Sequence, residues 1–313
     1  MATHTDTDTF AAVAPMHEER VTVGSRSIRC LTSGEGRPLL LCHGFLSSAE
    51  EFGGRFSALA AHRRLIIPDL PGSGESPPLG GRHTADALAA SLEELLAHLD
   101  VREFDLAGLC LGACVASALA RRCGDRVGRL VLHTPLVDPS LIRRRYRAQV
   151  RVLTTPPLWQ GVVALSRSRT VSNLYKRFVI AEGDVDAVTS EVNFVNQRRA
   201  DTGAAREWLR DGMRTRDLAM LSGRGCPTLI IVAAQDQVVD VESLRRFVAG
   251  CPNVSFFVDR EQGHGWNHAA VQRQLGVMLA FFSAEAPPPL SSPPPPAKRA
   301  RRRAVGRVSA GVH

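Results

Sequence analysis

Residues 105–113 read Asp-Leu-Ala-Gly-Leu-Cys-Leu-Gly-Ala and contain the pattern Gly-x-Cys-x-Gly. The apolar start of this run is typical of a buried strand, and the Ala-rich continuation, from Leu111 to about Arg122, is typical of a helix. In such a strand-turn-helix, called a nucleophile elbow, glycines flank the central residue because a Cβ there would strike its neighbours. The central residue here is Cys110, and the helix N-terminus that follows it favours a thiolate. The pattern alone is weak evidence, because small residues also occur wherever a helix packs closely on a sheet.

Strands and helices alternate on both sides of this stretch. Continuous apolar runs predict buried strands at 38–42, 65–67, 130–133, 228–232 and 254–258, and a hairpin is predicted within 21–31. Helical periodicity predicts helices at 49–61, 84–99 and 269–282. The alternation predicts an α/β fold with a mostly parallel central sheet flanked by helices.

Composition divides the chain into five parts. We expect a flexible N-terminus at 1–20, a core in two halves at 21–137 and 223–283, a helical lid at 138–222 and a disordered tail at 284–313. The formal net charge is +8, and the Pro-rich tail supplies +5 of it through six basic residues and one acid. Because the excess charge is concentrated in the tail, we expect no nucleic-acid partner.

Several classes of protein are disfavoured. No apolar run has the length of a bilayer span, and the first residues lack the pattern of a signal peptide, so we expect a soluble, cytoplasmic protein without a membrane partner. Seven cysteines without a repeating spacing do not indicate a disulfide framework. No Cys or His cluster has the spacing of a zinc site, and we expect neither a metal nor another cofactor.

The other groups needed for nucleophilic acyl transfer follow later strands. Such chemistry requires a nucleophile, a base, a group that orients the base, and donors for the oxyanion. Asp236 follows the strand at 228–232, and His264 follows the strand at 254–258. Asp138 and Asp240 are rival acids, and His268 is a rival of His264.

In their order these motifs resemble the α/β-hydrolase fold family over about residues 21–282. The matching motifs are His43-Gly44-Phe45 for the oxyanion loop, residues 68–74 (Pro-Asp-Leu-Pro-Gly-Ser-Gly) for the loop after the fourth strand, and residues 108–112 for the elbow. The resemblance implies that the backbone amides of Phe45 and Leu111 hold an oxyanion.

The resemblance further implies that Asp236 orients His264 and that Cys110 replaces the usual Ser. The elbow is also similar to that of dienelactone hydrolases and polyhydroxyalkanoate synthases. The synthases are longer, however, and the dienelactone hydrolases lack so large a lid.

The cysteine narrows the expected chemistry. Attack by a thiolate on a thioester exchanges one thioester for another and is close to thermoneutral, whereas attack on an ester is uphill. We therefore expect acyl transfer or hydrolysis through an acyl-Cys110 enzyme, with a coenzyme A or carrier-protein thioester as donor and water, an alcohol or an amine as acceptor. The alternatives are an ester or lactone hydrolase of the dienelactone-hydrolase type and a non-catalytic binding protein.

The predicted lid is strongly basic. Residues 140–179 contain nine Arg or Lys and no acid. The simplest interpretation is a solvated face, and the alternative is a docking surface for an acidic carrier protein or coenzyme A phosphates, with Arg143, Arg144 and Arg145 as candidates. Trp159 is a candidate for an apolar acyl pocket. We expect Cys114, one turn after Cys110, to be a core residue.

Overall fold

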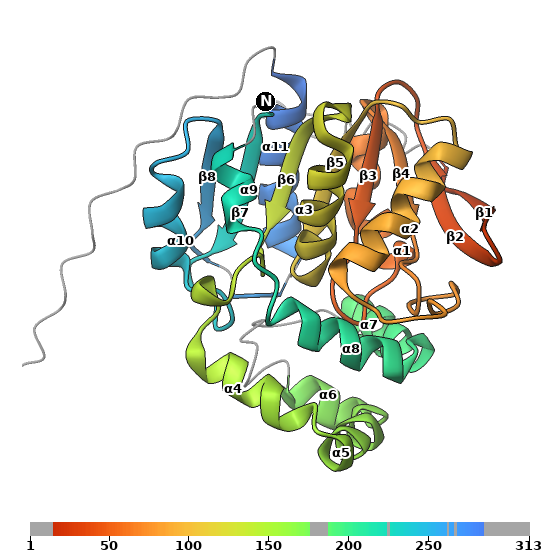
Figure 1. Ribbon diagram of the computed structural model, residues 1–313, viewed down its shortest axis with the longest axis vertical. Coiled ribbons are helices and arrows are strands. Elements are labelled where there is room, and N and C mark those ends of the chain that lie inside the picture. The colour runs from red at the N-terminus through yellow and green to blue at the C-terminus, as the bar shows by residue number, and fades with distance from the viewer. Residues whose placement is uncertain (1–14, 176–186, 224–225, 262, 266–267, 285–313) are drawn as a thin grey trace, which may run out of the picture.

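A mixed β-sheet forms the centre of the computed structural model, which describes residues 15–175, 187–223, 226–261, 263–265 and 268–284 (Figure 1). Its eight strands lie in the order β1-β2-β4-β3-β5-β6-β7-β8. The strands are β1 His17–Val23, β2 Arg26–Ser33, β3 Pro38–Cys42, β4 Arg64–Pro68, β5 Phe104–Leu109, β6 Val127–His133, β7 Thr228–Ala233 and β8 Val254–Asp259. From β4 to β8 all neighbouring pairs are parallel, so the predicted mostly parallel sheet is confirmed.

The edge formed by β1 and β2 differs from the rest of the sheet. These strands pair antiparallel with each other, and β2 pairs antiparallel with β4. The residues of β1 do not alternate between buried and exposed positions, and most of them are exposed, which is typical of an edge strand. It begins at His17, so residues 17–20, expected to belong to the flexible N-terminus, are paired with β2 instead. Residues 1–14 and the predicted tail from 285 onward lie outside the described residues.

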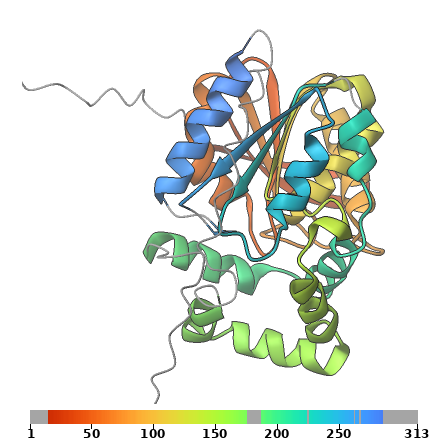
Figure 2. The same cartoon turned by 90° about the vertical axis from the view of Figure 1, so that its left-hand side faces the viewer.

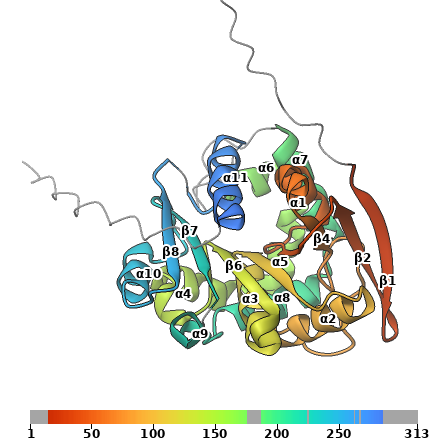
Figure 3. The same cartoon turned by 90° about the horizontal axis from the view of Figure 1, so that it is seen from above.

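Helices cover both faces of the sheet (Figure 3). α1 and α11 pack on one face, and α2, α3 and α10 pack on the other. Their bounds are α1 Ala49–Phe56, α2 Ala85–His98, α3 Leu111–Cys123, α10 Val241–Val248 and α11 His268–Ser283, with 3-10 turns η1 Ser57–Ala61 and η2 Gly124–Arg126. α10 was not among the predicted helices, although Asp240 caps its N-terminus by accepting from the Ser243 amide.

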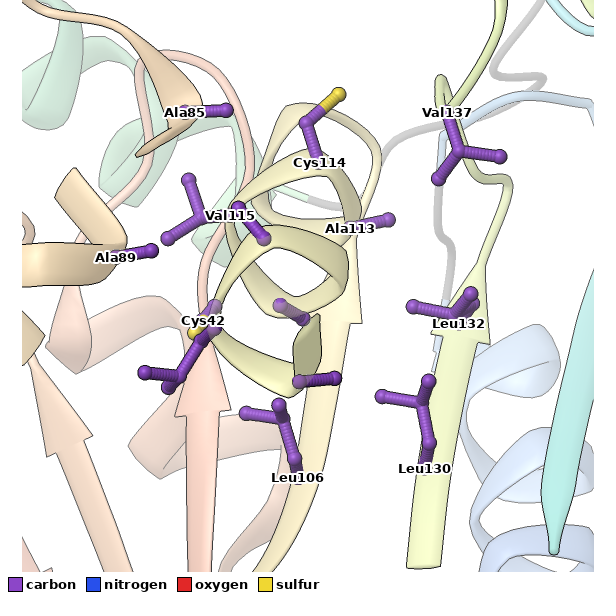
Figure 4. Packing of buried hydrophobic residues seen from close by; sticks show 14 of the residues in the cluster. Cys42, Ala85, Ala89, Leu106, Ala113, Cys114, Val115, Leu130, Leu132 and Val137 are labelled. Carbon is purple, nitrogen blue, oxygen red and sulfur yellow. The ribbon is translucent and has the colours of Figure 1, made fainter. Parts of the chain in front are cut away.

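α3 is the most deeply buried of these helices. Figure 4 shows it between α2, represented by Ala85 and Ala89, and strands β5 and β6, represented by Leu106 and Leu132. Small side chains on α3, such as Ala113, allow the helix axis to approach the sheet. Close packing on both sides fixes the position at which α3 begins, which is directly after Cys110.

The described part of the segment between β6 and β7 is largely helical. Figures 1 and 2 show its middle helices below the carboxyl ends of the strands, whereas its last helix, Leu218–Gly223, lies beside the sheet. It comprises the 3-10 turn η3 Pro139–Leu141 and helices α4 Arg144–Leu153, α5 Pro156–Ser166, α6 Arg169–Tyr175, α7 Ala187–Arg199, α8 Thr202–Gly212 and α9 Leu218–Gly223. We call residues 138–222 the cap; its motion as a lid stays a prediction. Within the described residues, no helix combines the length and hydropathy needed to cross a bilayer.

Candidate active site

Cys110 occupies a strained turn between β5 and α3. Its φ of 52° and ψ of −113° lie in a region that residues with a Cβ seldom adopt. The turn is fixed on both sides, because the Cys110 amide donates to the His133 carbonyl at 2.9 Å and Gly112 lies against the end of β3. A Cβ on Gly112 would stand 2.3 Å from the carbonyl oxygen of Cys42. The structure thus has the geometry of a nucleophile elbow.

Cys110, His264 and Asp236 are joined in one hydrogen-bonded chain. His264 Nε2 lies 3.2 Å from Cys110 Sγ, and His264 Nδ1 lies 2.9 Å from Asp236 Oδ2. The other Asp236 oxygen accepts from the backbone amides of Val238 and Val239 at 2.7 and 2.8 Å. These bonds hold the carboxylate in one orientation, and that orientation fixes the imidazole.

Asp236 and His264 stabilise each other's charged forms. Burial alone would lower the pKa of His264, but the charge of the Asp236 carboxylate and the nearby sulfur outweigh it and raise that pKa well above its usual value. Burial would likewise raise the pKa of Asp236, yet the His264 charge and the hydrogen bonds hold it below its ordinary value. The arrangement therefore favours an imidazolium beside a carboxylate at neutral pH.

The rival residues have other partners. Asp138 accepts from the Ser140 amide at the start of η3, and Asp240 caps α10. His268 is the first residue of α11. Among the acids weighed from the sequence, Asp236 is the one that contacts His264.

The two predicted oxyanion donors belong to the loop after β3 and to the first residue of α3. Leu111 opens α3, so its amide has no carbonyl four residues earlier to bond. Phe45 lines the same cavity as Cys110, and Gly44 approaches so closely that its Cβ would lie 3.6 Å from that of Cys110. His43 is buried and supports this loop, because its Nε2 accepts from the Leu70 amide at 3.0 Å.

Strained backbone gathers around this site. Leu46 (φ 54°), Cys110 (φ 52°) and Thr134 (φ 41°) are non-glycine residues with positive φ, and all three follow strand ends at the cap-side edge. Each such conformation costs of the order of 1–3 kcal/mol and persists only where the surroundings enforce it. The fold thus stores strain in the loops that surround the sulfur.

A buried polar network beneath the site was not predicted. His133 Nε2 lies 2.8 Å from Gln274 Oε1, and Gln274 donates to Asp259, which Arg273 holds through both carboxylate oxygens. Burial and the neighbouring His264 charge lower the pKa of His133 to about 3, so this ring is neutral. No motif marks these residues, because they come from β6, β8 and α11 and meet only in the folded chain.

A cavity of about 620 Å³ opens above Cys110. Cys110, His264 and Phe45 line it from the core, and helices α4 to α8 line it from the cap. Trp159 lines this cavity, and its Nε1 donates to the Thr202 carbonyl at 3.0 Å; its role in an acyl pocket stays a prediction. The volume is typical of small-molecule sites.

The three predicted docking arginines do not line this cavity. Arg143 donates from Nε to the Asp236 carbonyl at 3.0 Å, and Arg145 donates to the Gln237 side chain. Arg144 is exposed at the start of α4. Arg143 is therefore built into the loop that carries the acid, a role that the sequence does not reveal.

Among the described residues, no cluster of three or more His, Cys, Asp or Glu has the arrangement of a metal site. All seven cysteines are free thiols.

Comparison with known proteins agrees with this architecture. A family model described as "alpha/beta hydrolase fold" matches residues 37–267. The chain is 29% identical over 273 residues to the "Dihydrolipoyllysine-residue acetyltransferase component of acetoin cleaving system" of Pseudomonas putida, covering 84% of this chain and 68% of that protein. It is 28% identical over 236 residues to "2-hydroxy-6-oxononadienedioate/2-hydroxy-6-oxononatrienedioate hydrolase 2" of the same organism, covering 67% and 74%.

Solved structures show the same fold. A bromoperoxidase from Bacillus anthracis superposes with a TM-score of 0.72 at 18% identity, and the match covers 86% of this chain and 100% of the bromoperoxidase chain. An esterase from Thermogutta terrifontis superposes with a TM-score of 0.67 at 23% identity, covering 85% and 98%. At these identities the likeness concerns the fold alone.

Proposed function

The chain belongs to the α/β hydrolase fold family, and on that basis we propose that it is a cysteine acyltransferase or thioesterase with Cys110, His264 and Asp236 as its catalytic triad. The observation that carries the proposal is the chain of hydrogen bonds from Cys110 Sγ through His264 to Asp236, at 3.2 and 2.9 Å. Cys110 directly precedes the first residue of α3 and lines a cavity of about 620 Å³.

The first half-reaction forms the acyl-enzyme. The Cys110 thiolate attacks the carbonyl carbon of an acyl thioester, and the amides of Phe45 and Leu111 donate to the oxyanion that develops. When the tetrahedral intermediate collapses, the bond from carbon to the donor sulfur breaks. His264 Nε2 then gives its proton to the departing thiolate.

The second half-reaction releases the acyl group. Water, an alcohol or an amine attacks acyl-Cys110 while His264 Nε2 takes its proton, and the Cys110 thiolate leaves. Asp236 stays ionised and holds the imidazole so that Nε2 faces the sulfur throughout. The thioester donor is favoured because its exchange with Cys110 is close to thermoneutral.

Hydrolysis of an ester or lactone is the second candidate. A hydrolase stands among the curated relatives, which supports it. In this case the acyl-Cys110 intermediate forms uphill, so its steady-state amount is lower than with a thioester donor.

Intact-protein mass spectrometry tests the proposal. Wild type, Cys110→Ala and Cys114→Ala are each mixed with acyl thioesters and activated esters of matched chain length. We expect an acyl-sized mass increase on wild type and Cys114→Ala but not on Cys110→Ala, and the donor that loads fastest separates the two candidates. Undiminished turnover by Cys110→Ala would exclude Cys110 as the nucleophile.

A further inference from the structure

The cavity above Cys110 has two walls of different chemistry. The first, which we call the apolar arm, is formed by α4, α5 and α8 through Tyr146, Val150, Leu153, Trp159, Val162 and Leu209. The second, the polar arm, is formed by α1, α7 and the end of α5 through Glu51, Arg55, Arg167, Asn193, Gln197 and Arg198. One cavity thus offers an apolar surface and a donor-rich surface to the same ligand.

The arms lie over opposite faces of the sheet. Val150 and Leu209 of the apolar arm belong to the core on the side of α2 and α3. α7 of the polar arm contacts α1, which packs on the other face together with α11. Figure 3 shows the same division, with α4 and α8 on the side of α3 and α7 beside α1. Cys110, at the junction of β5 and α3, lines the same cavity as the residues of both arms.

The polar arm carries an excess of positive charge. Glu51 is the one acid among the described residues that line the cavity, and Arg55 neutralises it at 3.1 Å. Arg167 and Arg198 are exposed and have no ion pair with any other residue that the structure describes. Arg198 lies 5.9 Å from the centroid of the Phe194 ring, a contact that restrains its guanidinium. Two guanidiniums are therefore available to a ligand at the exposed rim.

Arginines near helix C-termini are common, because the helix dipole favours them there. Arg167 follows the end of α5, and Arg198 lies in the last turn of α7. What distinguishes this pair is that both line the cavity that contains the sulfur, together with the amide side chains of Asn193 and Gln197. Guanidinium and amide groups together bind a ligand that is rich in acceptor oxygens.

The position of His264 relates the arms to the reaction. The leaving thiolate must lie next to His264, which protonates it. His264 precedes α11, and α11 packs on the same face as α1, the face of the polar arm. The departing portion of the donor therefore lies toward the polar arm, and the acyl chain lies toward the apolar arm.

We propose that the polar arm binds the phosphate-bearing part of a phosphopantetheine thioester while the apolar arm binds the acyl chain. This inference rests on the function proposed above and adds the identity of the leaving group. Phosphopantetheine occurs in coenzyme A and on acyl carrier proteins, and both present phosphate oxygens beyond the reacting thioester. Arg167 and Arg198 are the residues that recognise them.

The test compares thioesters that share an octanoyl group and differ in charge. Single-turnover acylation of Cys110 is measured by rapid quench and mass spectrometry with octanoyl-pantetheine, octanoyl-coenzyme A and an octanoyl carrier protein. The proteins are wild type, the double variant Arg167→Gln/Arg198→Gln and the control Arg102→Gln. Arg102 is a suitable control because its side chain is 89% exposed and it lies outside the cavity lining.

We expect wild type to prefer coenzyme A over pantetheine by roughly tenfold at low salt, the effect of two exposed charge pairs. The double variant should bring this ratio close to one, as should about 0.5 M NaCl, whereas Arg102→Gln should keep the wild-type ratio. A carrier protein that loads fastest, and loses its advantage in the double variant, supports the same site with the carrier as its source.

The inference is overturned if wild type acylates equally fast with octanoyl-coenzyme A and octanoyl-pantetheine, or if the preference for coenzyme A survives in the double variant. In either case, loading by octanoyl-pantetheine leaves the proposed function intact. If no thioester loads, the proposed function fails, and calorimetric titration with adenosine 3′,5′-bisphosphate decides about the polar arm. Binding that the double variant weakens supports an anion site, and absence of binding overturns it.

Discussion

Replacing Asp236 by Asn changes one hydrogen bond and leaves the shape of the side chain unchanged. The Asn oxygen can still accept from the amides of Val238 and Val239, which bond Asp236 at 2.7 and 2.8 Å. The new NH₂ group faces His264 Nδ1, where the carboxylate stood at 2.9 Å. The NH₂ group of the introduced Asn is a donor and cannot pair with a protonated Nδ1. His264 must therefore carry its proton on Nε2, where it can no longer accept one from the Cys110 thiol.

The expected loss follows from the charge that disappears. Unit charges about 4 Å apart attract by about 4 kcal/mol at an effective dielectric constant of about 20. This attraction stabilises the imidazolium form of His264, and it thereby contributes to raising the pKa of His264 well above its usual value. Since about 1.4 kcal/mol corresponds to a factor of ten, we expect Asp236→Asn to acylate Cys110 about a thousandfold more slowly than wild type.

The assay is single-turnover acylation by a small thioester at neutral pH, combined with urea unfolding. Asp240→Asn and Asp138→Asn serve as matched controls, because each removes a carboxylate from the same edge of the sheet. Both side chains cap helical turns, so we expect these controls to lose at most about 1 kcal/mol of unfolding free energy and to acylate at the wild-type rate.

Two results would refute this reasoning. Acylation by Asp236→Asn within tenfold of wild type would mean that the carboxylate neither selects the tautomer nor stabilises the imidazolium. A comparable loss in Asp240→Asn would mean that the acid has been assigned to the wrong residue. The unfolding curve of Asp236→Asn serves as the stability control. A lowered free energy of unfolding would indicate damage to the fold, and an unchanged one would assign the slower acylation to the chemistry.

Three further predictions concern the surroundings of the site. Gly112→Ala places a Cβ 2.3 Å from backbone oxygens and should abolish soluble expression, whereas Gly161→Ala, in open space on α5, should be neutral or stabilise by up to about 1 kcal/mol in thermal unfolding. Arg143→Ala should slow acylation by a small thioester roughly threefold to tenfold by freeing the acid loop, while exposed Arg151→Ala should not. The pKa of His133 is about 3 when folded and about 6.5 when unfolded, so between these values the unfolded state binds the extra proton. Stability is therefore lost as pH falls from about 6.5, and urea unfolding at pH 7 and 4.5 should show a drop about 2–3 kcal/mol larger in wild type than in His133→Gln.

The parts of the site that could be predicted from sequence are those that local patterns specify. The glycines around Cys110 have to be glycine, because Gly108 and Gly112 meet backbone atoms within 3 Å. The positions of Asp236 and His264 follow from topology, since parallel strands end at one edge of the sheet. A motif and a topology together were sufficient to bring the three residues into contact.

The remaining features depend on contacts that no local pattern encodes. Asp236, Asp138 and Asp240 all follow strands near the edge, and only the course of the loop after β7 decides which one meets His264. Arg143 belongs to a basic run whose simplest interpretation was a solvated face, with docking of a partner as the alternative, but its Nε donates to a carbonyl across 93 positions of sequence. The division of the cavity into two arms likewise arises from how the cap helices pack.

The reactive thiol is distinguished by its position and not by its residue type. Cys114 lies one helical turn after Cys110, yet it is fully buried, its Sγ donates to the Leu136 carbonyl at 2.8 Å, and burial raises its pKa well above the usual value. Burial also raises the pKa of Cys42 to about 12. Cys110 alone among these three has an imidazole at 3.2 Å and a cavity in front of it. An electrophile added at neutral pH should therefore modify Cys110 in preference to Cys114 and Cys42. His264→Ala should slow the labelling of Cys110, because the imidazole favours its thiolate, while burial continues to protect Cys114 and Cys42.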